Sequence, residues 1–416
     1  MDIRLRLEVA GARKYEKVSY PIRYGTLAEI TLPGYRFHFT LNGEIKYLQG
    51  IGKNWPHPSE WLKRTVANHW IYYDSGGYNQ IYDYLGEYYL PCFTYPTNQL
   101  WEMNPFSQPQ VREALAVFRD LPRLLTEALK TGKWTEEEKA FLLRVARWDE
   151  TALAERAWRL EEIIGGKVNV LPPDSRHVDY DCIPLNLADG CLYRCRFCRV
   201  KTNRKFAVRP AEDIQKQLLE LKDFFGPELK NYNSLFLGEH DALNAGRKRI
   251  LEAAFLALET LELSRSHLEG CNLFLFGSVD SLLTAEESLF KELNRSPFRT
   301  YLNIGLESAH QETLDLLGKP LSAAKVEEAF RRLNEINRRY ERVEGTANFV
   351  IDLALPPGHW ESLSRLSRDF FPRYFDKGAL YLSPLSAKGR RELLRRFQEL
   401  KRKSRCPLYL YLIQRL

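Results

Sequence analysis

The second half of the chain repeats a pattern in which short apolar stretches alternate with longer amphipathic ones. The apolar stretches predict six strands, over residues 183–187, 234–237, 273–276, 301–304, 347–351 and 380–382. Between successive strands there is enough chain for a crossover helix and two loops, which is the arrangement of a parallel βα repeat. Six such units predict an α/β fold whose sheet curves into a partial (β/α)6 barrel rather than the closed eight-stranded form.

Polar residues suited to catalysis or ligand binding follow four of these predicted strands. Cys191 follows the first strand, Glu239 the second, Ser278 the third and Glu307 the fourth. In parallel α/β barrels the carboxyl ends of the strands meet at one face, and sites form on the loops there. We therefore expect these residues to share one site.

The run from Gly190 to Cys198 contains three of the seven cysteines of the chain, at positions 191, 195 and 198. Three thiolates at this spacing can hold an iron-sulfur cluster and leave one iron without a protein ligand. A structural zinc would need a fourth ligand, and the nearest candidate, Cys182, lies at the far end of the preceding strand. A redox dithiol would use only the last two cysteines and leave the first without a role. The iron-sulfur cluster is favoured among these three interpretations.

This CxxxCxxC run, with Phe197 directly before its last cysteine, resembles the hallmark of the radical S-adenosylmethionine (SAM) superfamily. The resemblance covers residues 180–385. Residues 303–308 and 348–356 are most similar to the branch that contains oxygen-independent coproporphyrinogen oxidases and methylthiotransferases. The resemblance implies a 4Fe-4S cluster on the three cysteines, SAM as a second cofactor, and a radical SAM partial barrel preceded by an α+β N-terminal domain.

The resemblance also implies roles for individual residues. Glu239 would accept hydrogen bonds from the amino group of SAM, Lys319 would meet its carboxylate, and Glu307 would bind ribose hydroxyls. Gly238 would allow the backbone to approach the ligand, although the usual Gly-Gly-Glu of the family is Leu-Gly-Glu here. The expected cofactor-binding residues are Phe197, Gly238, Glu239, Ser278, Glu307, Lys319 and Ile351, and the expected metal ligands are Cys191, Cys195 and Cys198. As alternatives, Glu239 and Glu307 could cap helices and Lys319 could be a solvated charge.

The implied reaction is reductive cleavage of SAM to a 5′-deoxyadenosyl radical, which abstracts hydrogen from a metabolite, lipid or peptide. The resemblance thus implies an oxidoreductase that works under anaerobic conditions with an external one-electron reductant such as ferredoxin or flavodoxin. The remaining cysteines stand singly, at positions 92, 182, 271 and 406. Sulfur insertion from a second cluster is therefore disfavoured, and no cobalamin-binding signature supports methyl transfer.

The pattern of the chain divides it into four regions. Residues 1–106 are a β-containing region, with a hairpin predicted over 36–48; residues 107–170 are a helical connector; residues 171–385 are the partial barrel; and residues 386–416 are a basic helix and tail. The segment from 70 to 101 holds eight of the 22 tyrosines. It is interpreted either as a packed layer, which is favoured, or as a stacking surface for a nucleobase, sugar or peptide.

The formal charge of +7 is concentrated near the C-terminus. From Lys388 onward, ten Lys or Arg residues accompany only Glu392 and Glu399. The spacing of Leu393, Leu394, Phe397 and Leu400 favours an amphipathic closing helix with a solvated basic side. Binding of nucleic acid is possible but not favoured, so the alternative functions are an RNA-modifying radical SAM enzyme and a non-enzymatic metal-binding protein.

Targeting signals are not apparent in the sequence. Charges at every second position of the N-terminus exclude the apolar core of a signal peptide, and no uncharged apolar stretch is long enough to span a bilayer. The odd number of cysteines does not suit a disulfide framework, and a reducing compartment would keep the clustered three available as metal ligands. We expect a cytoplasmic protein.

Overall fold

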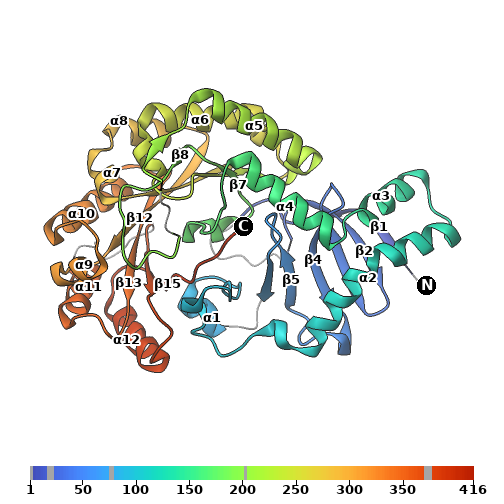
Figure 1. Cartoon of the computed structure of the whole chain (residues 1–416), viewed down its shortest axis with the longest axis horizontal. Helices are drawn as coiled ribbons and strands as arrows, with labels where there is room; N and C mark the ends of the chain where they lie inside the picture. The colour runs from blue at the N-terminus through green and yellow to red at the C-terminus, as the bar shows by residue number, and fades with distance from the viewer. Residues whose placement is uncertain (1–2, 16–22, 75–78, 201–203, 370–376) are drawn as a thin grey trace.

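The computed structural model describes residues 3–15, 23–74, 79–200, 204–369 and 377–416 and contains two large sheets (Figure 1). The first is a six-stranded antiparallel sheet whose strands are adjacent in sequence order. Its strands are β1 (Arg4–Ala10), β2 (Thr26–Leu32), β3 (Tyr35–Phe39), β4 (Ile45–Gly50), β5 (Glu60–Arg64) and β6 (Trp70–Asp74). The predicted hairpin is β3 and β4, in which Phe37 pairs with Leu48.

Helices follow this sheet, and the second and third of them pack on it. They are α1 (Asn79–Leu85), α2 (Pro109–Thr131), α3 (Glu136–Ala146) and α4 (Glu150–Ile164). Thr135 and Glu138 form a capping box at the start of α3, and Gly165 ends α4 in the left-handed conformation at φ 64°. The ring of Phe141 meets that of Phe39 edge-on, so α3 covers the face of the sheet from which Phe39 of β3 projects.

The second sheet is parallel throughout and has the order β15-β14-β13-β12-β11-β10-β7. Its strands are β7 (Ile183–Leu185), β10 (Ser234–Leu237), β11 (Cys271–Gly277), β12 (Phe298–Glu307), β13 (Val343–Ile351), β14 (Leu380–Pro384) and β15 (Leu408–Leu410). All six predicted strands are present, which confirms the α/β partial barrel. The seventh strand, β15, was not predicted, because only three residues after the basic helix join the sheet.

Helices cover the outer face of this sheet (Figure 1). They are α5 (Ala211–Phe225), α6 (Gly246–Thr260), α7 (Val279–Thr284), α8 (Glu287–Arg295), α9 (Gln311–Leu317), α10 (Ala323–Arg339), α11 (Pro357–Asp369) and α12 (Arg390–Lys403). Helix α12 is the predicted amphipathic helix, since Leu393, Phe397 and Leu400 are buried and Leu394 packs against the core. Among the described residues, no helix has the length and apolarity to cross a membrane.

Short elements complete the fold. A two-stranded ribbon is formed by β8 (Ala188–Asp189) and β9 (Ala207–Val208). The short 3-10 helices are η1 (Gly52–Asn54), η2 (Pro96–Asn98), η3 (Pro105–Ser107), η4 (Pro173–Val178), η5 (Gly226–Asn231), η6 (Ala242–Ala245) and η7 (Leu263–Arg265).

The floor of the barrel is polar, because the buried helix η4 fills it. Thr346 Oγ1 donates to Asp174 Oδ2 at 2.7 Å, Asn303 Nδ2 donates to Thr346 Oγ1 at 2.8 Å, and Asn303 also bonds Asn348. Burial raises the pKa of Asp174 to about 6. The buried polar side chains of Asp174, Asn303, Thr346 and Asn348 thus satisfy one another, which offsets the cost of burying them.

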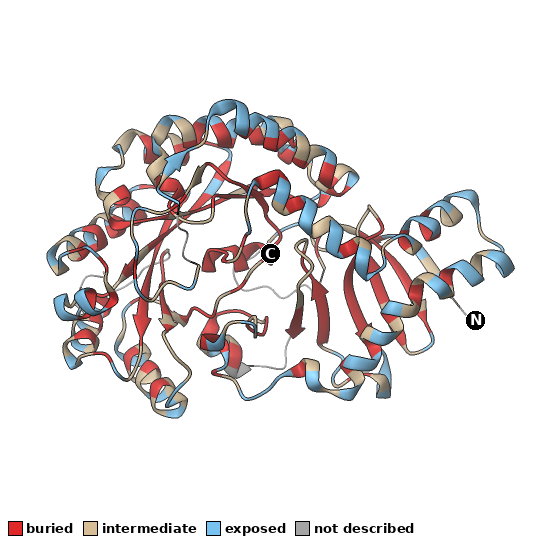
Figure 2. Ribbon diagram, in the orientation of Figure 1, coloured by how far each residue is buried: buried red, intermediate tan, exposed pale blue. Residues whose placement is uncertain are grey.

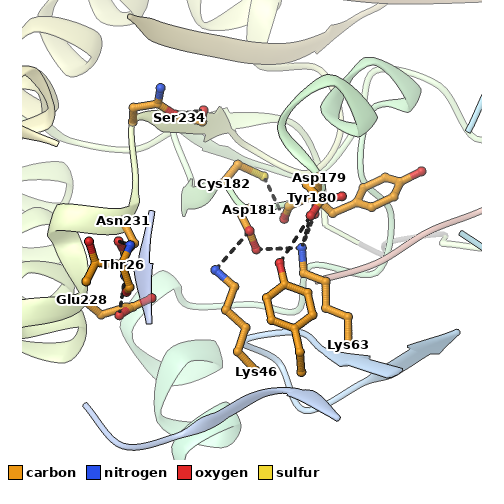
Figure 3. Close-up of polar contacts among 12 residues, drawn as sticks. Thr26, Lys46, Lys63, Asp179, Tyr180, Asp181, Cys182, Glu228, Asn231 and Ser234 are labelled. Carbon is orange, nitrogen blue, oxygen red and sulfur yellow. Dashed lines mark hydrogen bonds and ion pairs between the residues drawn. The ribbon is translucent and has the colours of Figure 1, made fainter. Parts of the chain in front are cut away.

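Buried ion pairs join the two sheets (Figure 3). Lys63 of β5 lies 3.1 Å from both Asp179 Oδ2 and Asp181 Oδ1, and Lys46 of β4 lies 3.1 Å from Asp181 Oδ2. All four side chains are at most 8% exposed. Because the two aspartates directly precede β7, these pairs anchor the start of the barrel to the N-terminal sheet. A second contact, from Asn231 to the backbone of Thr26, lies beside them.

The last residues of the chain lie between the N-terminal region and the barrel (Figure 1). Asn98 exchanges two hydrogen bonds with the backbone of Ile413, and Tyr411 donates its hydroxyl to Leu171 O at 2.7 Å. Four of the last six residues are buried, as are most strands of the two large sheets on either side of them (Figure 2). The end of the chain is therefore packed into the protein rather than extended into solvent.

The tyrosine-rich segment contributes mainly to the core. Tyr72, Tyr73 and Tyr89 are at most 1% exposed, and the rings of Tyr73 and Tyr89 are 4.6 Å apart. Tyr78 lies outside the described residues. These positions support the packed-layer interpretation of the segment.

Candidate active site

A cavity of about 430 Å³ lies at the carboxyl ends of the barrel strands. It brings together Cys191, Cys195, Cys198, Phe197, Glu239, Ser278, Glu307 and Lys319. Gly238 and Ile351 do not line it within the part of the chain that the structure describes. Most of the residues predicted from separate strand ends therefore meet at one place, as the register of the strands indicates.

The cysteine loop is held at both of its ends. Gly190 has φ 78°, and a side chain there would lie 2.4 Å from the carbonyl oxygen of Lys205, so only glycine fits. Farther along, the N–H of Arg196 donates to Leu317 O at 2.8 Å, which ties the loop to the end of α9. Phe197 packs in a cluster with Val350. The loop is thus positioned by the barrel itself.

The three thiols form one wall of the cavity. Burial raises the pKa of Cys195 to about 11, while Lys319 opposes this shift, and burial together with the nearby Asp241 raises the pKa of Cys191. Across the described residues, no three His, Cys, Asp or Glu side chains are grouped around a single metal position. The thiolates of a 4Fe-4S cluster bind three different irons, so they need not converge on one point. Three thiols without a fourth ligand fit such a cluster.

Glu239 follows Gly238, whose φ of 76° turns the chain at the end of β10. Glu239 Oε1 accepts a hydrogen bond from Asn169 N at 2.8 Å, and burial raises the pKa of Glu239 to about 7. The next helical turn, η6, starts only at Ala242, and its first residues have no side-chain cap. Glu239 therefore faces the cavity instead of capping a helix.

Glu307 and Lys319 form an ion pair, although the sequence suggested separate roles for them. Lys319 Nζ lies 3.3 Å from Glu307 Oε1 and donates to Gly305 O at 2.5 Å. Glu307 has φ 68°, an unfavourable conformation for a residue other than glycine, at an irregularity in the register of β12. Ser308 rather than Glu307 accepts a hydrogen bond from the N–H of His310, before α9. The pair presents one carboxylate and one ammonium side by side in the wall of the cavity.

Ser278 and Ile351 both have structural roles in the barrel. Ser278 Oγ caps α7 by accepting from Ser281 N at 3.0 Å. Ile351 is fully buried, two residues after Phe349, whose ring packs on Phe330 of α10. Because side chains alternate along a strand, Ile351 shares the helix-facing side of β13.

Asp241 lines the cavity but was not among the predicted residues. It is 4% exposed, and its Oδ1 accepts from Ser278 N at 3.0 Å and from Ser281 Oγ at 2.7 Å. Its Oδ2 has no hydrogen-bond partner among the described residues. The available signal was its place in the Gly-Glu-His-Asp run that ends the second predicted strand.

Tyr411 is a second lining residue that was not predicted. With Val170 and Phe276 it forms an apolar part of the wall. The residue comes from the end of the chain, which no sequence pattern directs into the barrel.

A second cavity of about 480 Å³ adjoins the first. The two share Val200, Glu239 and His240 in their walls. The second cavity is bordered by polar and charged groups, including Asp189, Asn169 and Arg199. Glu239 and His240 therefore stand at the junction between the two cavities.

Comparisons with solved structures return distant radical SAM enzymes. A radical SAM methyltransferase from Sphaerobacter thermophilus is 16% identical, with 55% of this chain and 65% of that chain covered and a TM-score of 0.36. The radical SAM methyltransferase TsrM from Kitasatospora setae, with cobalamin and a 4Fe-4S cluster bound, is 15% identical (50% and 38% covered, TM-score 0.33). The protein anSMEcpe with bound SAM is 14% identical (54% and 63% covered, TM-score 0.38). The chain spans less than two thirds of each of these structures.

No curated protein matches the sequence. A family model described as the Radical SAM superfamily matches residues 185–351, from the first barrel strand to the end of β13. This span contains the cysteine loop and the strand ends that surround the cavity. Residues 185–351 are thus a radical SAM domain, the class of enzyme domain that uses a 4Fe-4S cluster and SAM as cofactors.

Proposed function

We propose that this enzyme cleaves SAM reductively and uses the resulting 5′-deoxyadenosyl radical to abstract hydrogen from a small organic substrate held in the barrel. The observation that carries the proposal is the cavity in which three cysteines face Glu239, Asp241 and the Glu307–Lys319 pair. When bound, the cluster and SAM supply the electron transfer and the carbon-sulfur cleavage.

The residues of the chain bind and orient the cofactors in this proposal. Cys191, Cys195 and Cys198 hold the cluster. The carboxylates of Glu239 and Asp241 accept the N–H groups of the amino end of SAM, and an ionised acceptor strengthens such bonds. Lys319, held by Gly305 and Glu307, provides the cation for the carboxylate of SAM.

The rest of the wall suits a small substrate with an apolar part. Val170, Phe276 and Tyr411 supply apolar surface, and Asn348 adds a polar group from the barrel floor. The C-terminal tail and the N-terminal region pack beside the strands where the sheet is not closed, between β7 and β15 (Figure 1). This packing limits access of water and of stray hydrogen donors to the site.

Anaerobic reconstitution with iron and sulfide tests the proposal. The protein reduced with dithionite should convert SAM to 5′-deoxyadenosine and methionine, measured by liquid chromatography. Cys195→Ala should abolish this conversion and lower the iron content, because it removes a cluster ligand. Cys271→Ala is the matched control, since Cys271 begins β11 at the opposite end of the barrel. A wild-type protein that binds four irons and cleaves no SAM would refute the proposal, as would equal loss in both variants.

A further inference from the structure

The loop that carries the three cysteines is strongly basic. Between Gly190 and Phe206 the sequence contains six Lys or Arg residues and no Asp or Glu. Arg194, Arg196 and Arg199 each stand directly beside one of the cysteines. The residues next to the expected cluster ligands are therefore positively charged.

Four of these basic side chains are exposed, and no acidic residue in the described part of the chain pairs with them. Arg194, Arg196, Arg199 and Lys205 are all exposed, and none of them is in an ion pair with an acidic residue that the structure describes. Arg204 differs, because it pairs with Asp189. The loop thus presents uncompensated positive charge to solvent.

Exposed apolar side chains accompany this charge. Leu192 in the loop is 41% exposed, and Leu316 of α9 is 54% exposed. Leu316 belongs to the same region because the next residue, Leu317, accepts the hydrogen bond from Arg196 N. Helix α9 also carries the exposed acids Glu312 and Asp315, so the positive region is confined to the loop. Apolar residues within a charged rim are typical of transient protein interfaces.

We propose that this surface, formed by Leu192, Arg194, Arg196, Arg199, Lys205 and Leu316, docks an acidic one-electron carrier protein. The inference rests on the proposed function, in which the cluster needs an external electron. One electron leaves the reduced carrier and is taken up at the cysteine-held cluster, and no bond forms or breaks in this transfer. A positive surface steers a negative partner to the correct face and raises the association rate.

A carrier protein explains the position of the surface better than nucleic acid does. The basic residues alternate with the cluster ligands, so a partner bound here lies next to the cluster. The exposed leucines add apolar contact, whereas binding of a phosphate backbone depends on charge. Small, weak interfaces are also the usual kind between electron-transfer proteins.

The test compares two ways of reducing the same protein. SAM cleavage is driven either by flavodoxin with its reductase or by dithionite, in wild type and in the double variant Arg196→Glu with Lys205→Glu. Neither residue lines the two cavities described above. At low salt the KM for flavodoxin should rise by about tenfold or more, and its dependence on salt should weaken. The dithionite-driven rate and the iron content should stay unchanged.

The matched control is the double variant Arg402→Glu with Lys403→Glu, at the exposed basic end of α12. It should keep the wild-type KM for flavodoxin. An unchanged KM in the loop variant, or an equal rise in both variants, would overturn the inference. A third outcome would also overturn it. If the loop variant lost binding to a mixed RNA pool while its KM for flavodoxin stayed unchanged, the surface would bind nucleic acid instead. If wild type cleaves no SAM even with dithionite, the proposed function fails, while salt-sensitive binding of flavodoxin still tests the surface separately.

Discussion

Replacing Asp241 by asparagine separates binding of the ligand from stability of the fold. Asp241 Oδ1 already accepts two hydrogen bonds, from Ser278 N and Ser281 Oγ, and the carbonyl of asparagine can keep both. The new amide nitrogen then occupies the position of Oδ2, which has no partner among the described residues. A donor would face the amino end of SAM where wild type offers an ionised acceptor.

The expected loss follows from the worth of a hydrogen bond to a charged group. Such a bond contributes about 1.5–3 kcal/mol, so the Kd for SAM should rise roughly 10- to 150-fold. Equilibrium dialysis of labelled SAM against the reconstituted protein measures this directly. The exposed Asp223→Asn on α5 serves as the control and should bind SAM as wild type does.

The thermal stability of the Asp241→Asn variant should not fall along with its affinity for SAM. A buried carboxylate oxygen without a partner costs free energy, so Asp241→Asn should leave the Tm of the ligand-free protein equal to that of wild type or higher. Weakened binding with a lowered Tm would mean that the variant disrupts the fold. A Kd within about threefold of wild type, less than 1 kcal/mol, would refute the proposed role of Asp241.

Three further predictions concern protonation and the domain contact. Because burial raises the pKa of Glu239 to about 7, the affinity for SAM should increase from about pH 6 to about pH 8 as the carboxylate ionises, and dialysis should show a flat profile for Glu239→Gln. Burial raises the pKa of Glu87 to about 8 from 4.5, so the folded state holds a proton that the unfolded state has lost between these values. Stability to urea should therefore fall as the pH rises through this window, and Glu87→Gln should reduce the slope. Lys63→Met leaves Asp179 and Asp181 short of a cation in the interior and should lower the free energy of unfolding in urea by roughly 3–5 kcal/mol. The exposed Lys53→Met is the control and should lower it by less than about 1 kcal/mol. An equally small loss for Lys63→Met would contradict the importance of the buried pairs.

The barrel and the cysteine loop could be predicted because their signals are local in sequence. A parallel strand buried on both faces is an apolar run, and the cysteine spacing needs only eight successive residues. The strand register then placed Glu239, Ser278 and Glu307 at the same face. Local patterns carry this information without any knowledge of how distant segments pack.

The rest depended on contacts between distant segments. The pairing of Lys319 with Glu307 requires the left-handed backbone at Glu307, which no propensity favours. The place of Tyr411 depends on three-residue β15, which is too short to predict and pairs with β14 across the whole of α12. A correctly predicted strand also does not tell which of its side chains face the cavity. Ile351 was expected at the site, but it lies on the helix-facing side of β13.

The distribution of charge around the cluster site connects the two proposals. The cavity is lined by the three carboxylates of Glu239, Asp241 and Glu307 and by two cations, Lys319 and Arg194. Lys319 pairs with Glu307, and neither Glu239 nor Asp241 forms an ion pair with a basic residue that the structure describes. The cavity therefore favours a ligand of net positive charge, and SAM, with its sulfonium and ammonium groups and one carboxylate, has that charge. Outside, the exposed arginines of the cysteine loop attract a negative protein. The cysteine loop thus separates a negative interior that suits the cofactor from a positive exterior that suits an acidic electron donor, and reversing the outer charges should impair the donor while leaving the binding of SAM intact.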